Sequence, residues 1–153
     1  MRLINIDRAG VILREYAVEL DAVDAPEGAQ YLSHGMSEIL VLDENRPLSV
    51  ACTTIQDADG EYENYIRIWE LDLTDATDVH GVESLIDAEF TPVSRRLLID
   101  LYDAGLFPID NIEGMAFGSN LPNGNPALVL ANDNNFDFET QVQQLVLLEI
   151  TGE

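Results

Sequence analysis

The chain has 153 residues, of which 46% are hydrophobic and 24% are charged, which is enough for one domain with its own core. Its basic residues are seven arginines with no lysine, against 29 Asp and Glu, for a formal net charge of -22. This balance argues against nucleic acid and against anionic membranes as partners, because both are bound through basic patches. Cationic ligands fit the composition better.

The single cysteine and the N-terminal segment bear on disulfide formation and on export. Cys52 has no partner for an internal disulfide, and its place in the apolar run 48–55 predicts a small core side chain. No basic stretch followed by a long apolar region stands at the N-terminus, and no apolar run is long enough to cross a bilayer. As given, the chain is expected to be soluble and to carry no signal peptide.

Segments of β character follow one another from end to end, separated by turns rich in Asp, Asn, Gly and Pro. The segment 74–88 is compatible equally with a short helix and with an irregular loop, because its apolar spacing is poor. The acidic stretch DADGEYEN lacks the spacing of an EF-hand and predicts a solvated hairpin loop. The sequence therefore predicts an all-β chain with strands at 2–7, 11–20, 38–42, 48–55, 65–73, 94–101, 112–118, 127–131 and 142–151.

The chain also repeats itself. SEILVL at 37–42 matches IEGMAF at 112–117, and WELDL at 69–73 matches VLLEI or LLEIT near the C-terminus. Glu38 and Glu113 are 75 positions apart, and Asp72 and Glu149 are 77 apart, so two landmarks keep nearly one offset. A tandem repeat of four antiparallel strands is what a β-propeller blade requires.

This phasing predicts one partial propeller domain over 1–153, an incomplete ring of about two and a half blades. Residues 1–20 would end one blade, residues 32–101 would form one blade, and residues 111–151 would form most of a further blade. The chain would then begin and end within a blade. Its open blade edges would be available for self-association.

Four residues are candidate metal ligands: Glu38, Glu113, Asp133 and Asn134. The first two begin equivalent strands, which in a propeller line the central channel, and the other two lie in ALVLANDNNFDFET directly after a strand. Carboxylate and amide oxygens are the ligands that Ca²⁺ prefers. An Asx-rich turn is the alternative for NDNN, since Asn and Asp bond their own backbone.

No catalytic residue can be assigned from the sequence. His34 and His80, the only histidines, are expected in loops without a role. HGMSEI lacks the second glycine of a hydrolase nucleophile elbow, and neither a phosphate-binding loop nor a dinucleotide fingerprint is present.

Five segments in order, GMSEILVLDENRPLSV, NYIRIWELDLTDATDV, PVSRRLLIDL, DNIEGMAFGSNLPNG and NDNNF followed by QVQQLVLLEI, resemble the esterase-like phytase family, also called the phytase-like domain. The likeness covers nearly the whole chain but only the C-terminal portion of that family's domain. It implies a propeller-like fold, an extracellular or periplasmic location, and hydrolysis of a small-molecule ester or phosphate ester. The four candidate ligands lie on the family's signature segments.

The chain departs from the family pattern at one place. Where relatives commonly have a Glu-Arg pair after the second strand of the GMSE blade, this chain reads Ala51-Cys52-Thr53-Thr54. Two functions are therefore expected. The first is the C-terminal part of a calcium-dependent esterase or phosphoesterase, and the alternative is a non-catalytic propeller fragment that acts as a binding or assembly module.

Overall fold

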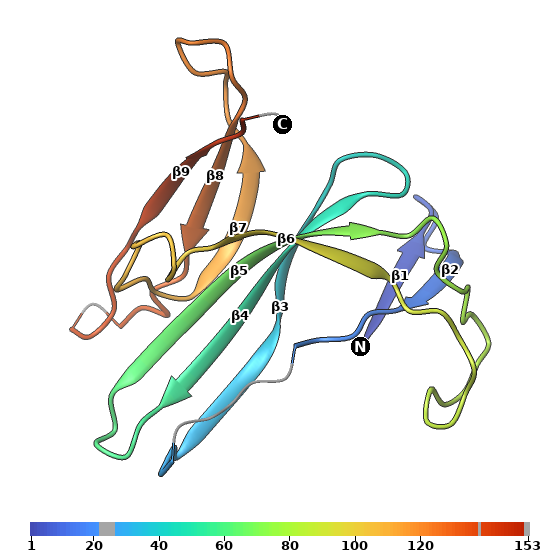
Figure 1. The fold of residues 1–153 in the computed structure, drawn as a ribbon, viewed down its shortest axis with the longest axis horizontal. Helices are drawn as coiled ribbons and strands as arrows, with labels where there is room; N and C mark the ends of the chain where they lie inside the picture. The colour runs from blue at the N-terminus through green and yellow to red at the C-terminus, as the bar shows by residue number, and fades with distance from the viewer. Residues whose placement is uncertain (22–26, 138, 152–153) are drawn as a thin grey trace.

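The computed structural model describes residues 1–21, 27–137 and 139–151, and it is built from β-strands joined by turns and irregular segments (Figure 1). No helix is present in these ranges, which confirms the all-β prediction. The strands are β1 (Arg2–Ile6), β2 (Ile12–Ala17), β3 (Tyr31–Val41), β4 (Pro47–Gln56), β5 (Tyr62–Asp72), β6 (Ser94–Asp100), β7 (Ile112–Phe117), β8 (Ala127–Asn132) and β9 (Leu145–Glu149).

The strands form three antiparallel sheets in which every strand pairs with its neighbour in the chain. The orders are β1-β2, β3-β4-β5-β6 and β7-β8-β9. Figure 1 shows the four-stranded sheet between the other two, with β3 and β7, the first strands of their sheets, in contact with each other. The hydroxyl of Ser37 on β3 donates to the carbonyl of Ile112 on β7 at 2.7 Å.

One face of the four-stranded sheet packs on the β7-β8-β9 sheet through aliphatic side chains. Alternate residues of β4 and β5 point to this face, as the period of two along a strand requires. Burial of each such side chain stabilises the fold by about 1.5 to 3 kcal/mol. This core consists of Leu48, Val50, Ile66, Ile68, Leu101, Ile109, Ile112, Met115, Leu128 and Leu130.

The opposite face meets the β1-β2 sheet through a smaller cluster and several charged groups. Arg95 donates to the Asp21 carboxylate at 2.8 Å and lies 4.6 Å from the centroid of the Trp69 ring. Arg67 lies 3.7 Å from Asp21 and donates to Asp100 at 2.7 Å. The apolar members of this contact are Tyr16, Val18, Leu71, Leu73 and Val93.

Three sequence expectations are corrected. The strand expected from Glu38 begins at Tyr31, because the ladder with β4 runs from Tyr31 opposite Gln56 through a bulge beside Glu38. His34 therefore lies in a strand, where its Nδ1 bonds the Thr53 hydroxyl at 2.6 Å. The strand expected over 142–151 is shorter, because residues 142–144 bond mainly the side chains of Asp110 and Asn132, and their one backbone bond with β8 is the long one from the Asn132 amide to the Gln144 carbonyl at 3.4 Å.

The remaining open segments follow local turn chemistry. Residues 74–88 are irregular, so the loop alternative is correct, and Tyr16 forms an isolated bridge with Asp78. The β4–β5 connection is the predicted hairpin loop, in which the Asp57 carboxylate accepts from the amides of Asp59 and Glu61 at 2.9 Å each. Gly60 has a φ of 91°, a conformation that favours glycine.

Candidate functional site

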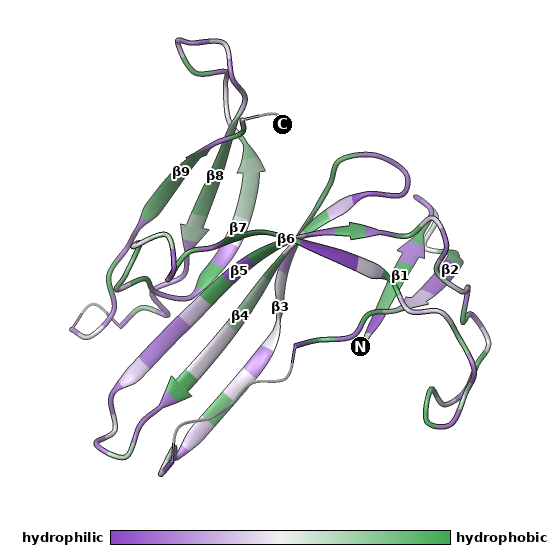
Figure 2. Ribbon diagram, in the orientation of Figure 1, coloured by the Kyte–Doolittle hydropathy of each residue, from purple (hydrophilic) through white to green (hydrophobic). Residues whose placement is uncertain are grey.

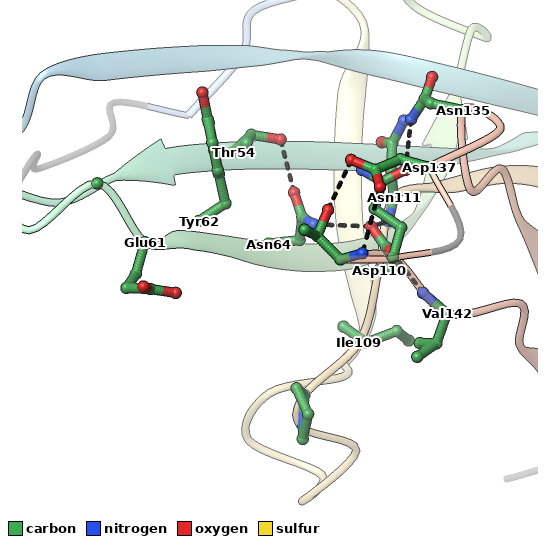
Figure 3. Close-up of a pocket in the computed structure, with 14 residues that line it drawn as sticks. Thr54, Glu61, Tyr62, Asn64, Ile109, Asp110, Asn111, Asn135, Asp137 and Val142 are labelled. Atoms are coloured by element: carbon green, nitrogen blue, oxygen red, sulfur yellow. Dashed lines mark hydrogen bonds between the residues drawn. The ribbon is translucent and has the colours of Figure 1, made fainter.

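A cleft of about 730 Å³ lies where the ends of β4 and β5 meet the loops before β7 and after β8 (Figure 3). Its lining includes the carboxylates of Glu61, Asp110 and Asp137, and no arginine or histidine is among the lining residues. The hydroxyl of Thr140 and backbone amides lower the pKa of the Asp137 carboxyl, so this group is ionised at neutral pH. The cleft is therefore acidic, and it favours cations.

Asp110 is the centre of a hydrogen-bond network that joins two sheets across this cleft. Its Oδ1 accepts from the Asn111 amide at 2.8 Å and from Asn64 Nδ2 at 3.4 Å, and its Oδ2 accepts from the Val142 amide at 3.3 Å. Thr54 in turn donates to the Asn64 side-chain oxygen at 2.6 Å. Figure 3 shows these side chains converging from β4, β5 and the loop before β7. The Asp110 carboxylate is held in one orientation.

The neighbouring Asn111 connects this network to two of the predicted metal ligands. Its side-chain amide donates to the Glu113 carboxylate, and its backbone carbonyl accepts from the backbone amide of Asp133 at 3.0 Å. The Cys52 thiol donates to Asn111 Oδ1 at 3.2 Å. Burial raises the pKa of this thiol, against the opposing effect of the Thr54 hydroxyl and with a smaller contribution from the carboxylates of Glu113 and Asp110, so it remains protonated and acts as a donor.

Backbone irregularities set the positions of Glu38 and Glu113. The register of β7 against β8 shifts between Ile112 and Gly114, which leaves Glu113 as the extra residue of a bulge. The register of β3 against β4 shifts between Met36 and Glu38, which leaves Ser37, the residue before Glu38, as the extra residue there. Bulges re-aim side chains and are common next to active sites. The repeat seen in the sequence thus extends to a shared backbone feature.

Turn chemistry in the loop after β8 accounts for much of the polar run NDNN. Asp133 Oδ1 accepts from the Asn135 amide at 3.0 Å, and the buried Asn134 accepts from the Phe136 amide at 3.3 Å. Asn132 Oδ1 accepts from the Gln144 amide at 2.6 Å, which ties β8 to the segment before β9.

Phe136 in the same loop is in an unfavourable conformation. Its φ is 59°, a left-handed value that bulky side chains seldom adopt, and its side chain is 87% exposed. Burial of the ring therefore does not offset the strain. Strained residues of this kind concentrate at functional sites, and the flanking Asn135 and Asp137 line the cleft.

The four predicted ligands are only partly brought together. Glu113 and Asp133 both contact Asn111, whereas the Glu38 carboxylate accepts from its neighbouring Ile39 amide at 2.7 Å, and Asn134 belongs to the turn. In the described ranges, no group of three His, Cys, Asp or Glu side chains is arranged to hold a metal ion. The calcium site stays a prediction.

Sequence reasoning missed Asp110, Asn64 and Thr54. Asp110 and Asn111 open the segment DNIEG, which was recognised for its glutamate alone. Thr54 and Cys52 lie in the stretch 51–54, where the sequence departs from the pattern of the family that it resembles, and both contact this network. This departure from the family pattern was the feature of the sequence that could have indicated a contribution of β4 to the site.

Comparison with known proteins gives one match. A family model named phytase-like, described as "Esterase-like activity of phytase", matches residues 1–136. The match includes every strand from β1 to β8 and ends in the loop after β8. No curated protein and no solved structure matches the chain. Within the described residues, no helix is long and apolar enough to span a membrane.

Proposed function

Because the chain belongs to the phytase-like family, we propose that it is the C-terminal part of a calcium-dependent esterase or phosphoesterase and that the acidic cleft binds its substrate. The observation that carries this proposal is the cleft itself. Most of its lining lies inside the family match, while Asp137, Thr140, Gln141 and Val142 follow the match, and its hydrogen-bond network leads to Glu113 and to the backbone of Asp133. An extracellular or periplasmic location is part of the same proposal.

We interpret the three sheets as parts of propeller blades, about two and a half in number. Each sheet is an antiparallel meander, and the sheets pack face to face in chain order. The first strands β3 and β7 contact each other, as the inner strands of neighbouring blades do. In this arrangement Glu38 and Glu113 would face the central channel.

The charge of the cleft gives the reason for a cation. A phosphate ester would be repelled by Glu61, Asp110 and Asp137, and no basic side chain lines the cleft to offset this. Calcium, when bound, would offset the substrate's charge and activate a water molecule. The oxygen-rich donors beside the cleft fit such an ion, with Glu113 and Asp133 as first ligands and Glu38 and Asn134 as further candidates.

The remaining roles belong to residues of the network. Asp110 holds Asn64 and Asn111 in place through its carboxylate. Asn111 then orients the Glu113 carboxylate through its amide. Asp110 and Asn111 are positioning residues here, because their bonds go to other side chains and to backbone.

The proposal is tested by hydrolysis of p-nitrophenyl acetate and p-nitrophenyl phosphate, each with calcium and with a chelator. We expect calcium-dependent release of nitrophenol from at least one substrate. Glu113→Gln should lower the calcium-dependent rate about 10- to 100-fold, as loss of a ligand or its support does. The matched control is Glu139→Gln, which removes the same charge from an exposed position. A folded chain without calcium-dependent hydrolysis of either ester would contradict the proposal.

A non-catalytic module is the second candidate, and the Cys52–Thr54 region favours it. A protonated thiol and a hydroxyl cannot replace the acid and the cation of a Glu-Arg pair. A chain that binds calcium without hydrolysing either ester would support this alternative.

A further inference from the structure

The lining of the cleft combines carboxylates with an apolar wall. Glu61, Asp110 and Asp137 contribute the carboxylates, and within the described part of the chain no basic side chain lies among the lining residues. The apolar wall consists of Tyr62, Pro108, Ile109 and Val142. The volume of about 730 Å³ is that of a small-molecule site, for which about 300 to 1,000 Å³ is usual, rather than that of a single ion. The ligand should therefore carry positive charge and also present apolar surface.

Tyr62 is the aromatic side chain of this wall, and it stands among polar residues. It begins β5, and Figure 2 shows the adjoining half of this strand as mainly hydrophilic. Gln56 lies opposite both Tyr62 and Tyr31, and the two tyrosine rings make an edge contact with their centroids 6.5 Å apart. This contact supports the Tyr62 ring and leaves 62% of the residue exposed. An exposed aromatic ring attracts a cation that lies over its face, within about 6 Å of its centroid.

The carboxylates of Asp110 and Asp137 reach the cleft from the loops of the neighbouring sheet. Tyr62 belongs to the four-stranded sheet, whereas Asp110 precedes β7 and Asp137 follows β8 (Figure 3). Both carboxylates already accept bonds from within the chain: Asp110 from the Asn111 amide at 2.8 Å, and Asp137 from the Thr140 hydroxyl at 2.7 Å. These bonds hold the two negative charges in fixed positions. A cation that is held by charge and contact, without hydrogen bonds of its own, would leave these bonds intact.

We propose that the substrate of this site is an ester whose alcohol part carries a quaternary ammonium group, and that this group binds against Tyr62 beside the carboxylates of the cleft. The inference rests on the proposed hydrolase function and names its substrate class. A quaternary ammonium group has no N–H donors, so contact with the ring and the apolar wall costs it no hydrogen bond. Its charge is attracted by the carboxylates, whereas a neutral alkyl group would bury them without compensation.

The calcium proposed for catalysis would use different groups. Glu113 and Asp133 lie beside the cleft and not among its lining residues, so the ammonium group and the calcium ion would not compete for ligands. Hydrolysis would break the bond between the acyl or phosphoryl group and the alcohol oxygen. The hydroxyl of water would add to that group, and the proton of water would pass to the alcohol oxygen. The products are an acid and an alcohol that keeps the ammonium group.

The test compares hydrolysis of acetylcholine and of 3,3-dimethylbutyl acetate, in which carbon replaces the charged nitrogen, with calcium and at an ionic strength of about 0.15 M. We expect kcat/KM to be about tenfold or more higher for the charged ester, because the two esters have the same shape and differ in charge. Tyr62→Leu should lower kcat/KM for acetylcholine about 3- to 10-fold and leave the uncharged ester unaffected, because leucine keeps an apolar side chain but removes the ring. Tyr62→Phe keeps the ring and should match the native chain.

Binding of tetramethylammonium tests the same site without turnover. Isothermal titration calorimetry at this ionic strength, set with sodium chloride, should show saturable binding that Tyr62→Leu weakens about 3- to 10-fold. Asp137→Asn should also weaken the binding, because it removes a negative charge from the cleft. Asp103→Asn is the matched control, since it removes the same charge from an exposed residue outside the lining and should leave binding unchanged.

The two measurements separate the inference from the proposed function. Tetramethylammonium binding that Tyr62→Leu weakens, without hydrolysis of any ester, would contradict the hydrolase function and support the cation site. Calcium-dependent hydrolysis with equal kcat/KM for the two esters would support the function and overturn the inference. Tetramethylammonium binding that is absent, or that Tyr62→Leu leaves unchanged, would also overturn the inference.

Discussion

The four-stranded sheet makes two contacts of different kinds with its neighbours. Toward β7-β8-β9 it buries a continuous aliphatic core of ten side chains. Toward β1-β2 it buries five apolar side chains and adds the pairs of Asp21 with Arg95 and Arg67. The first contact is stabilised by removal of apolar surface from water, whereas the second relies in part on charges that salt and acid weaken. Variants in the two contacts should therefore differ in how much stability they lose and in how that loss depends on salt and pH.

Truncation of the aliphatic core should have the largest effect. Leu130 and Leu71 are both fully buried, one in each contact. Leu130→Ala should lower the free energy of unfolding by about 3 to 5 kcal/mol, and Leu71→Ala by about 2 to 3 kcal/mol, because the smaller cluster collapses around the cavity more easily. Urea denaturation of both variants measures the difference. An equal or larger loss in Leu71→Ala would contradict the distinction between the contacts.

Loss of the Asp21 carboxylate should have a smaller and salt-dependent effect. Asp21→Asn removes the ion pairs with Arg95 and Arg67, although Arg67 keeps Asp100. The partly exposed pairs should contribute about 1 kcal/mol or less. Denaturation at low and at high ionic strength measures the free energy of unfolding of Asp21→Asn and of the native chain. The difference between the two should shrink with salt, while the effect of Leu130→Ala stays constant. A difference for Asp21→Asn that is unaffected by salt would argue against an ionic contribution.

The smallest effect should appear at acid pH in the β1-β2 contact. The Asp78 carboxylate accepts from the amides of Glu15 and His80, each at 3.0 Å, and these bonds lower its pKa in the folded state below the ordinary value of 3.8. Its stabilising effect is therefore complete above that value and is lost as the pH falls through the lower, folded pKa. Asp78→Asn should be less stable than the native chain at neutral pH, and the free energies of unfolding of the two chains should converge in acid.

Urea denaturation between about pH 5 and about pH 2.5 measures this convergence. Asp75→Asn, in the same segment, controls for the change in net charge. A difference between Asp78→Asn and the native chain that is as large at the lowest pH as at about pH 5 would show that Asp78 does not act through its charge.

Local sequence signals predicted most of the strands. Alternating β-branched and aliphatic residues bounded by turn residues placed β4, β5, β6, β7 and β8 within a few positions. The first half of β3 was missed because Ser33, His34 and Gly35 have loop character, and only pairing with β4 makes them a strand. The repeat of Glu38 and Glu113 was recognised, but their bulges depend on register between strands and have no local signature.

The site was predicted less completely for a similar reason. Glu113 and Asp133 belong to recognisable segments, and the structure connects both to Asn111. Asn64 and Asp110, however, are 46 positions apart and meet only because the end of β5 approaches the loop before β7. Such a contact is tertiary, so the spacing of residues along the chain could not reveal it.

The central claim is that the acidic cleft and its neighbours Glu113 and Asp133 bind calcium. The most direct measurement is thermal unfolding of the chain with calcium titrated against a chelator, at an ionic strength fixed by a monovalent salt. We predict a saturable rise in the unfolding temperature that is selective for calcium. At a calcium concentration about 100 times the dissociation constant, this rise corresponds to about 2.7 kcal/mol of added free energy of unfolding. It should be absent in Glu113→Gln. A cooperative unfolding transition that is indifferent to calcium would contradict the account and leave NDNN as a polar turn.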